Sequence, residues 1–267
     1  MPYVDLSNAG RTNIFYVEHG SGLEVVFVHG NTGSSRWFER VMDLRGCKTV
    51  ALDMPNFGRS SALPGEPDID RYADAVAAFL SVLKIEKTVI VGHSLGGAVA
   101  ISLAVRNPKL LRGLVLVDSA SPSGLRTPED RYPVIESMRT NRDVLSAALS
   151  AVVPMLKDKD FFEALVDDAA LMAPPAWIGN ACALSRFDYR GKCEAFTAPV
   201  LVMWGRKDVI VTEAMARETA QAFPGARLVI LDYVGHSVVA EDPKGFVRLL
   251  SRFLSDIGAL SDPGKED

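Results

Sequence analysis

The residues Gly92-His93-Ser94-Leu95-Gly96 place a serine between glycines in the pattern G-x-S-x-G. A serine on a tight turn from a strand into a helix projects its hydroxyl as a nucleophile, and glycines let the backbone pass through so crowded a turn. The apolar run Thr88–Val91 precedes the pattern and small apolar residues follow it, as such a turn requires. A glycine-rich turn with a bystander serine would give the same letters, but this setting favours Ser94 as a nucleophile.

A serine hydroxyl attacks a carbonyl carbon only when a base takes its proton, and the chain has 4 histidines to offer. His19 lies in an early turn, His29 ends a different strand, and we expect the ring of His93 to point away from its neighbour Ser94. His236 follows the last predicted strand, just before a predicted helix. We therefore predict that His236 is the general base.

The base needs a carboxylate that fixes its tautomer and stabilises the imidazolium. Asp208 follows the penultimate apolar run, which gives the chain order Ser94, Asp208, His236 of a hydrolase with a nucleophile on such a turn. All three residues follow predicted strands, where open α/β sheets place their sites. Asp118 follows the preceding run and is the competing acid.

A tetrahedral intermediate carries an oxyanion that preorganised N–H groups must stabilise. We predict the backbone N–H of Leu95, directly after the nucleophile, as one donor. The second donor is expected from the loop His29–Gly33, with the N–H of Asn31 as the candidate and that of Thr32 second. The alternative is that this loop is only a turn, since turns favour Gly and Asn. This chemistry requires no metal and no cofactor.

Short apolar runs separated by amphipathic stretches predict an α/β fold with right-handed crossovers. Most of the runs are rich in Val, Ile and Leu without alternation, as expected of strands buried on both faces of a parallel sheet. The first two runs are expected to form a pair across the turn Gly20-Ser21-Gly22. The predicted strands are Asn13–Glu18, Glu24–Val28, Lys48–Leu52, Thr88–Val91, Gly113–Val117, Pro199–Trp204 and Arg227–Leu231. The predicted helices of this part are Ile69–Leu83, Leu95–Arg106, Glu213–Phe223 and a last one from Pro243 to about Ile257.

The interval between Ser119 and Thr197 breaks this alternation, because it contains helical patterns and no convincing strand. Its predicted helices are Glu129–Arg139, Arg142–Val153, Asp160–Met172 and Trp177–Arg186. We therefore predict an α/β core formed by residues 1–119 and 197–267, with residues 120–196 inserted as a helical cap.

Large apolar residues in and near the predicted cap could line a pocket for an apolar acyl group. At helical spacing such residues more often form the core of the cap than contact a ligand. The residues in question are Trp37, Phe38, Met155, Phe161, Phe162, Leu171, Met172 and Trp177.

Composition excludes several classes of protein. The chain has 267 residues, 48% hydrophobic and 23% charged, which is typical of a globular protein. Its net charge of −4, without a run of like charges, argues against nucleic-acid binding. The 3 cysteines lack metal-binding spacing and are predicted to be reduced, buried fillers. The first residues show no secretory signal, and glycines interrupt the uncharged stretch Thr88–Val105, so we expect a cytoplasmic protein without a membrane span.

Taken together, these motifs resemble the α/β-hydrolase superfamily. The landmarks follow in order: His29-Gly30, Asp53-Met54-Pro55-Asn56-Phe57-Gly58-Arg59-Ser60, Gly92-His93-Ser94-Leu95-Gly96-Gly97, Gly205-Arg206-Lys207-Asp208 and Gly235-His236. The resemblance implies a mostly parallel eight-stranded sheet flanked by helices, an inserted helical cap, and a triad of Ser94, Asp208 and His236.

Details of the motifs narrow the subfamily. Ser94 stands where haloalkane dehalogenases have an aspartate nucleophile, so a dehalogenase is disfavoured. His93 and Leu95 depart from the Asn-Ser-Met-Gly-Gly of ring-cleavage C–C hydrolases. The loop from His29 to Ser35 is similar to small bacterial esterases and to α/β-hydrolase lactonases that act on N-acyl homoserine lactones.

The sequence therefore predicts a serine hydrolase that cleaves small, partly apolar esters, including lactones, through an acyl-enzyme. One alternative keeps the triad but cleaves a C–C or amide bond. Another is a receptor with a hydrolase fold that binds a small ligand with little turnover. The predicted partner is a small molecule, and the sequence gives no prediction of oligomeric state.

Overall fold

The computed structural model of the chain describes residues 3–6 and 12–260. The ends of the predicted core ranges, at residues 1–2 and 261–267, lie outside the described residues. None of the helices in the described part has the length and apolar character needed to span a membrane.

An eight-stranded sheet runs through the molecule in the order β1-β2-β4-β3-β5-β6-β7-β8. The β1–β2 and β2–β4 pairs are antiparallel and all the other pairs are parallel, which confirms the predicted fold class. The strands are β1 (Tyr3–Leu6), β2 (Thr12–Gly20), β3 (Leu23–Val28), β4 (Cys47–Leu52), β5 (Thr88–His93), β6 (Leu111–Val117), β7 (Val200–Gly205) and β8 (Arg227–Leu231).

Two features of the sheet differ from the sequence predictions. Strands β2 and β3 do not pair with each other, because β4 lies between them and bonds to both. The glycines at 20 and 22 still make a tight turn, with φ angles of +74° and +114°. The edge strand β1 was not predicted, because four residues are too few to show a hydrophobic period.

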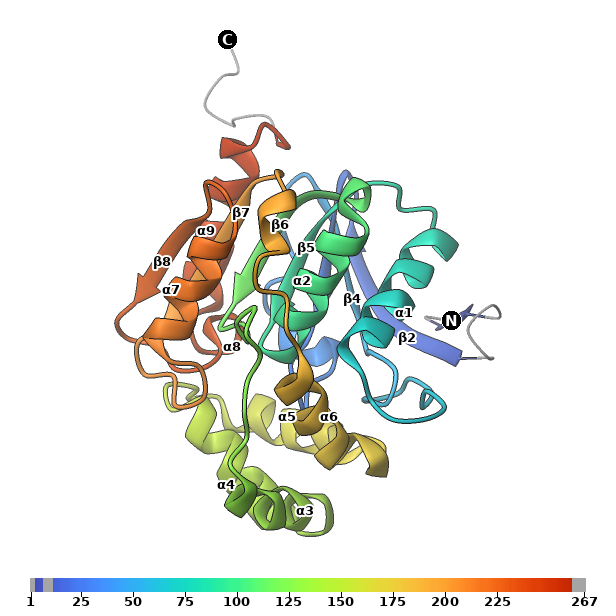
Figure 1. Cartoon of the computed structure of the whole chain (residues 1–267), viewed down its shortest axis with the longest axis vertical. Helices are drawn as coiled ribbons and strands as arrows, with labels where there is room; N and C mark the ends of the chain where they lie inside the picture. Colours follow the sequence, from blue (N-terminus) through green and yellow to red (C-terminus); the bar gives the residue numbers. More distant parts are fainter. Residues whose placement is uncertain (1–2, 7–11, 261–267) are drawn as a thin grey trace.

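Helices cover both faces of the sheet. Figure 1 shows α1, α2 and α7 in front of the sheet and α9 behind it. The ring of Phe246 in α9 lies 6.4 Å from that of Phe27 in β3, so this helix shares the core of the central strands. These helices are α1 (Ile69–Val82), α2 (Leu95–Arg106), α7 (Glu213–Ala222), the short α8 (Val238–Glu241) and α9 (Pro243–Asp256).

Between β6 and β7 the chain forms another group of helices, which lie together at the bottom of Figure 1, at one end of the sheet. The helix predicted from Trp177 begins earlier, with Pro174 and Pro175 in its first turn. Proline fits the first turn of a helix, whose N–H groups have no partner within the helix. The group comprises α3 (Tyr132–Thr140), α4 (Arg142–Val152), α5 (Lys159–Ala170) and α6 (Pro174–Arg186).

The register of the parallel strands brings the loops after them to one edge of the sheet. Val28 at the end of β3 lies opposite Gly92 of β5, and His93 lies opposite Val117 at the end of β6. At the next pair, Val117 lies opposite Met203 of β7. The segments that carry Asn31, Ser94, Asp118 and Asp208 therefore leave the sheet side by side.

Candidate active site

Ser94 occupies a strained turn between β5 and α2. Its backbone has φ 54° and ψ −117°, a conformation that residues other than glycine rarely adopt. The turn is crowded: a Cβ at Gly96 would lie 2.3 Å from the carbonyl oxygens of Val28 and His29. A glycine is therefore required at position 96. This strand–turn–helix setting is the one expected from the sequence.

The structure brings Ser94, His236 and Asp208 together in a hydrogen-bonded line. Nε2 of His236 lies 2.8 Å from Oγ of Ser94, and Nδ1 lies 2.7 Å from Oδ2 of Asp208. The other carboxylate oxygen of Asp208 accepts hydrogen bonds from the N–H groups of Ile210 and Val211, at 2.7 and 2.9 Å. A carboxylate at Nδ1 favours the tautomer that carries its proton there. In that tautomer Nε2 is free to accept the hydroxyl proton of Ser94.

The surroundings of His236 favour its protonated form. Burial alone would lower the pKa of His236, but Asp208, Asp118 and Glu241 outweigh burial and raise the pKa above its ordinary value. The imidazole thereby becomes a stronger base for the serine proton. The carboxylates also stabilise the imidazolium that forms when the proton moves.

Asp118, the competing acid, does not hydrogen-bond to the histidine. Its Oδ1 accepts the N–H of Gly205 at 2.8 Å, and its Oδ2 is buried without a partner among the described residues. Burial raises the pKa of Asp118 to about 8, and the nearby His236 opposes this shift. Of the two candidates, Asp208 has the geometry of the acid.

The predicted oxyanion donors flank the nucleophile. Leu95 is the first residue of α2, where backbone N–H groups have no acceptor within the helix. Within the described part of the chain, neither its N–H nor that of Asn31 hydrogen-bonds to a protein acceptor. Thr32, the second candidate, has φ 55° and donates its hydroxyl to the carbonyl of Asn31 at 2.6 Å.

His29 holds the loop that carries Asn31. The N–H of Met54 donates to Nε2 of His29 at 2.9 Å, so Nδ1 carries the proton and donates to the carbonyl of Gly30 at 2.8 Å. Burial lowers the pKa of His29 and keeps it in this neutral form. The ring is therefore a structural part of the loop.

His93, which precedes Ser94, hydrogen-bonds to the backbone of His236. Its Nε2 donates to the carbonyl of His236 at 2.7 Å, and its ring stacks on that of Trp37 at 5.6 Å. Burial and the nearby His236 lower the pKa of His93 to about 3, so the ring stays neutral. The sequence did not predict this contact.

A cavity of about 280 Å³ opens above the line of Ser94 and His236. Its wall is mostly apolar, and of the described residues that line it none is Lys, Arg, Asp or Glu. Helices α3, α4 and α6 supply much of this wall, with Ile135, Met138, Ala148, Leu149, Val152 and Leu184. The arrangement suits a neutral substrate with an apolar part.

Of the large apolar residues considered as pocket lining, only Trp37 lines this cavity. Phe38, Phe161, Met172 and Trp177 are buried in the hydrophobic core, and Leu171 is 55% exposed. Met155 and Phe162 also lie outside the cavity wall. The interpretation as core was therefore the better one. The α-helical residues that do line the cavity belong to α3, α4 and α6, and none of the described lining residues belongs to α5.

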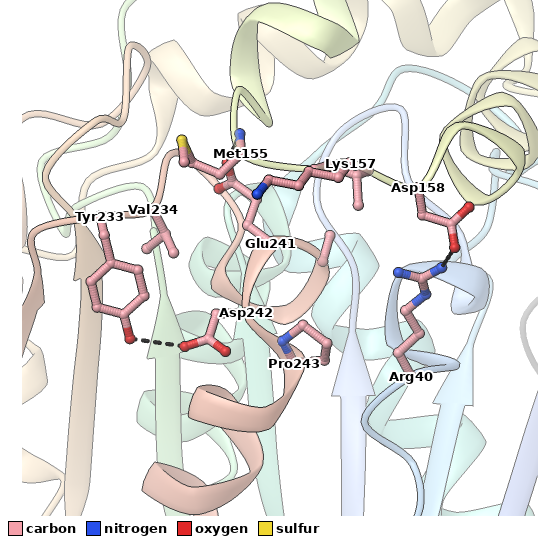
Figure 2. Close-up of a pocket in the computed structure, with 11 residues that line it drawn as sticks. Arg40, Met155, Lys157, Asp158, Tyr233, Val234, Glu241, Asp242 and Pro243 are labelled. Carbon is pink, nitrogen blue, oxygen red and sulfur yellow. Dashed lines mark hydrogen bonds and ion pairs between the residues drawn. The ribbon is translucent and has the colours of Figure 1, made fainter.

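Glu241 in α8 fixes both sides of the histidine loop and was not predicted. Its Oε2 accepts the N–H groups of Gly235 and Ser237, at 2.7 and 3.4 Å, on either side of His236. Its Oε1 accepts the N–H of Met155 at 2.8 Å, in the turn between α4 and α5. Figure 2 shows Glu241 reaching from α8 toward Met155 across a surface groove. One carboxylate thus ties the predicted base to the helices over the cavity.

Two of the three cysteines are buried as predicted, whereas Cys182 in α6 is only half-buried. Cys47 and Cys193 are buried, and burial raises the pKa of each thiol to about 11. Among the described residues, no group of three or more His, Cys, Asp or Glu side chains is placed to hold a metal ion.

Comparison with known proteins gives matches over most of the chain. The profile of the family described as "Alpha/beta hydrolase family" matches residues 25–249. A Pseudomonas syringae pv. syringae (strain B728a) protein, provisionally named carbamate hydrolase RutD, is 30% identical over 89% of this chain and 96% of its own. The 2-hydroxymuconate semialdehyde hydrolase of Pseudomonas putida is 29% identical over 94% of this chain and 92% of its own.

A solved structure agrees with the fold described above. The esterase EaEST from Exiguobacterium antarcticum superposes with a TM-score of 0.86 and covers 95% of this chain and 98% of its own. Its sequence identity is 20%, so this likeness concerns the fold alone.

Proposed function

The chain belongs to the alpha/beta hydrolase family, and we propose that it is a serine hydrolase of small neutral carboxylic esters, lactones included. The observation that carries the proposal is the line from Ser94 through His236 to Asp208, with contacts of 2.8 and 2.7 Å. This line lies beside an apolar cavity whose described lining residues include no Lys, Arg, Asp or Glu. An ester carbonyl is neutral, and its acyl chain can occupy such a wall.

In the first half of the proposed reaction, Oγ of Ser94 attacks the carbonyl carbon while its proton passes to Nε2 of His236. The carbonyl oxygen becomes an oxyanion and accepts hydrogen bonds from the N–H groups of Leu95 and Asn31. Asp208 stabilises the imidazolium through Nδ1. When the intermediate collapses, the imidazolium protonates the departing alkoxide, and the acyl group remains on Ser94.

In the second half, His236 takes a proton from water and the resulting hydroxide attacks the acyl-enzyme. A second oxyanion forms at the same N–H groups, the acid is released, and the proton returns from His236 to Ser94. With a lactone, the alcohol released in the first half stays attached to the acyl group. The same residues therefore serve open and cyclic esters.

We further propose that residues 120–196 act as the cap predicted from the sequence and select the acyl group. Helices α3, α4 and α6 contribute most of the apolar side chains of the cavity wall, such as Met138, Leu149 and Leu184. Residues 1–119 and 197–267 would then provide the catalytic core.

Hydrolysis of a C–C bond is a second candidate, because one relative is named 2-hydroxymuconate semialdehyde hydrolase. A muconate derivative carries a carboxylate, and a cationic side chain would balance its charge in a mostly apolar cavity. None of the described residues lining the cavity is Lys or Arg. Neutral esters therefore fit this wall better.

The proposal is tested with wild type, Ser94→Ala and Ser123→Ala. Ser123 is a matched control, because its hydroxyl contacts Glu218 outside the cavity. Each protein is assayed on p-nitrophenyl esters of rising chain length, and on acyl homoserine lactones followed by proton release. We expect turnover by wild type and Ser123→Ala and none above background by Ser94→Ala. Full activity in Ser94→Ala would contradict the proposal, and binding without turnover in wild type would favour a receptor.

A further inference from the structure

Buried side chains form a continuous line of hydrogen bonds that ends at Asn31 in the active-site loop. The amide of Asn56 donates to the hydroxyl of Tyr72 at 2.9 Å, and this hydroxyl donates to Oδ1 of Asn180 at 2.8 Å. Nδ2 of Asn180 then donates to Oδ1 of Asn31 at 2.8 Å. Tyr72 and Asn180 are fully buried and Asn56 is 5% exposed, so water does not compete for the bonds among these three residues.

The direction of every bond in this line follows from its first member. The backbone N–H of Leu63 lies 2.9 Å from Oδ1 of Asn56, and a backbone N–H can only donate. The amide nitrogen of Asn56 must therefore face Tyr72. The hydroxyl of Tyr72, accepting from Asn56, must give its own proton to Asn180. Turning the amides over would place donor against donor at Leu63.

The free end of the line is the side-chain nitrogen of Asn31. Because Oδ1 of Asn31 faces Asn180, Nδ2 is left with its hydrogens available. It has no acceptor among the described residues, and it is not sealed from solvent as a buried unpaired atom would be. Asn31 lines the same cavity as Ser94 and His236. The apolar pocket therefore contains a hydrogen-bond donor of fixed orientation.

We propose that the side chain of Asn31 is a specificity determinant that donates a hydrogen bond to an oxygen in the acyl part of the substrate. Asn180, Tyr72 and Asn56 are positioning residues that hold this donor toward the cavity. The inference rests on the proposed ester hydrolysis at the same site. The substrate class it identifies is a neutral ester whose acyl chain carries an ether, keto or amide oxygen, in preference to a plain alkyl ester.

The residues of this hydrogen-bonded line come from three separate segments of the fold, which holds the line rigid. Asn180 belongs to α6 and Tyr72 to α1, while Asn56 lies in the loop after β4. That loop also accepts, at the carbonyl of Asn56, the N–H of Ala173 at 2.8 Å, just before α6. A helix over the cavity is thus joined to the core through the same residues that orient Asn31. Hydrogen bonds in such a buried line polarise one another, which strengthens the donor at its end.

The experiment compares pairs of esters that differ by one oxygen in place of one methylene. The pairs are p-nitrophenyl methoxyacetate with butyrate, and p-nitrophenyl 3-methoxypropionate with pentanoate. The readout is the ratio of kcat/KM within each pair, measured for wild type and variants. The ratio does not depend on how much enzyme is folded, and intrinsic ester reactivity cancels when variants are compared with wild type.

Asn31→Asp keeps an oxygen toward Asn180 and replaces the donor by an acceptor, whereas Asn180→Ala and Tyr72→Phe break the line further away. Tyr233→Phe is the matched control, because its hydroxyl bonds Asp242 at 2.8 Å outside the cavity (Figure 2). We expect the preference for the oxygen-bearing ester of at least one pair to fall by about threefold to tenfold in the three variants, the size of one hydrogen bond. The control should keep the wild-type ratio.

Unchanged ratios in Asn31→Asp, or in both Asn180→Ala and Tyr72→Phe, would overturn the inference. Hydrolysis of butyrate that depends on Ser94 would meanwhile uphold the proposed function. Absence of any hydrolysis that depends on Ser94 would instead show that the proposed function itself is wrong.

Discussion

Replacement of Asp208 by Asn is the sharpest perturbation of the proposed triad, because the structure dictates how the new amide must lie. Oδ1 of Asp208 accepts two backbone N–H groups, from Ile210 and Val211. Only an amide oxygen can face them, so the new NH₂ group must face Nδ1 of His236. Nδ1 must then be the unprotonated nitrogen. The proton moves to Nε2, which can no longer accept the proton of Ser94.

The size of the loss follows from the geometry. Asp208 and the imidazolium are in direct contact, at 2.7 Å. Two unit charges about 4 Å apart interact by about 4 kcal/mol at an effective dielectric constant of 20. Their loss alone slows the reaction by about a thousandfold. The wrong tautomer adds to this, and the same change in a serine protease triad costs kcat about 10⁴-fold. We therefore expect Asp208→Asn to lower kcat by about 10³- to 10⁴-fold, with little change in KM.

The assay is steady-state hydrolysis of p-nitrophenyl butyrate, with thermal unfolding to check that each variant is folded. Asp118→Asn is the matched control, since it makes the same chemical change after the neighbouring strand. Asp118 does not hydrogen-bond to His236, and the oxygen of the new amide can still accept the N–H of Gly205, as Oδ1 of Asp118 does. We expect a loss of less than about tenfold. Strong loss in Asp118→Asn with near-normal rates in Asp208→Asn would refute the reasoning and make Asp118 the acid.

The remaining predictions concern pH, substrate charge and stability. His236 must be neutral to act as a base, and nearby carboxylates raise its pKa. We therefore expect kcat/KM to rise with pH through a midpoint above 6.5. A midpoint below 6 would contradict the effect of these carboxylates on His236. p-Nitrophenyl hemisuccinate should have a kcat/KM about a hundredfold below that of the butyrate, because the described lining residues include no Lys or Arg to balance its carboxylate charge. Equal values would show that the cavity admits anions. Asp168 in α5 is 7% exposed and bonds to Arg36 at 2.9 Å and to Ser34 at 2.7 Å. Asp168→Ala should therefore lower the free energy of unfolding by about 2–3 kcal/mol, measured by urea denaturation, and a change below about 0.5 kcal/mol would show that the contact is not stabilising.

The positions of Ser94, Asp208 and His236 could be predicted because each signal is local. Each residue follows an apolar run that forms a parallel strand, and such strands end at one edge of the sheet. The register from Val28 to Gly92 and from Val117 to Met203 provides that edge. The chain order favoured Asp208 over Asp118, although both follow strands, and in the structure only Asp208 contacts the histidine.

Features that depend on distant pairing were not predicted. Strand β4 enters between β2 and β3, and nothing in the turn between those two strands indicates this. The sequence favoured the core for the large apolar residues, and packing does place Phe38 and Trp177 there. Nothing in the sequence indicated that Met138 and Leu149 line the cavity. Asn180 contacts Asn31 across 149 residues of sequence. This contact depends on where α6 packs against the core, and the spacing of apolar residues along a helix does not predict that position.

The most direct test of the central claim is covalent labelling of the nucleophile. An organophosphonate ester that reacts only with activated serines is incubated with wild type, Asp208→Asn and Ser94→Ala, and the modified peptide is identified by mass spectrometry. If Ser94 is activated by His236 and Asp208, wild type is labelled on Ser94 alone, Asp208→Asn is labelled far more slowly, and Ser94→Ala is not labelled. Labelling of another serine, or equal rates in wild type and Asp208→Asn, would contradict the proposed triad.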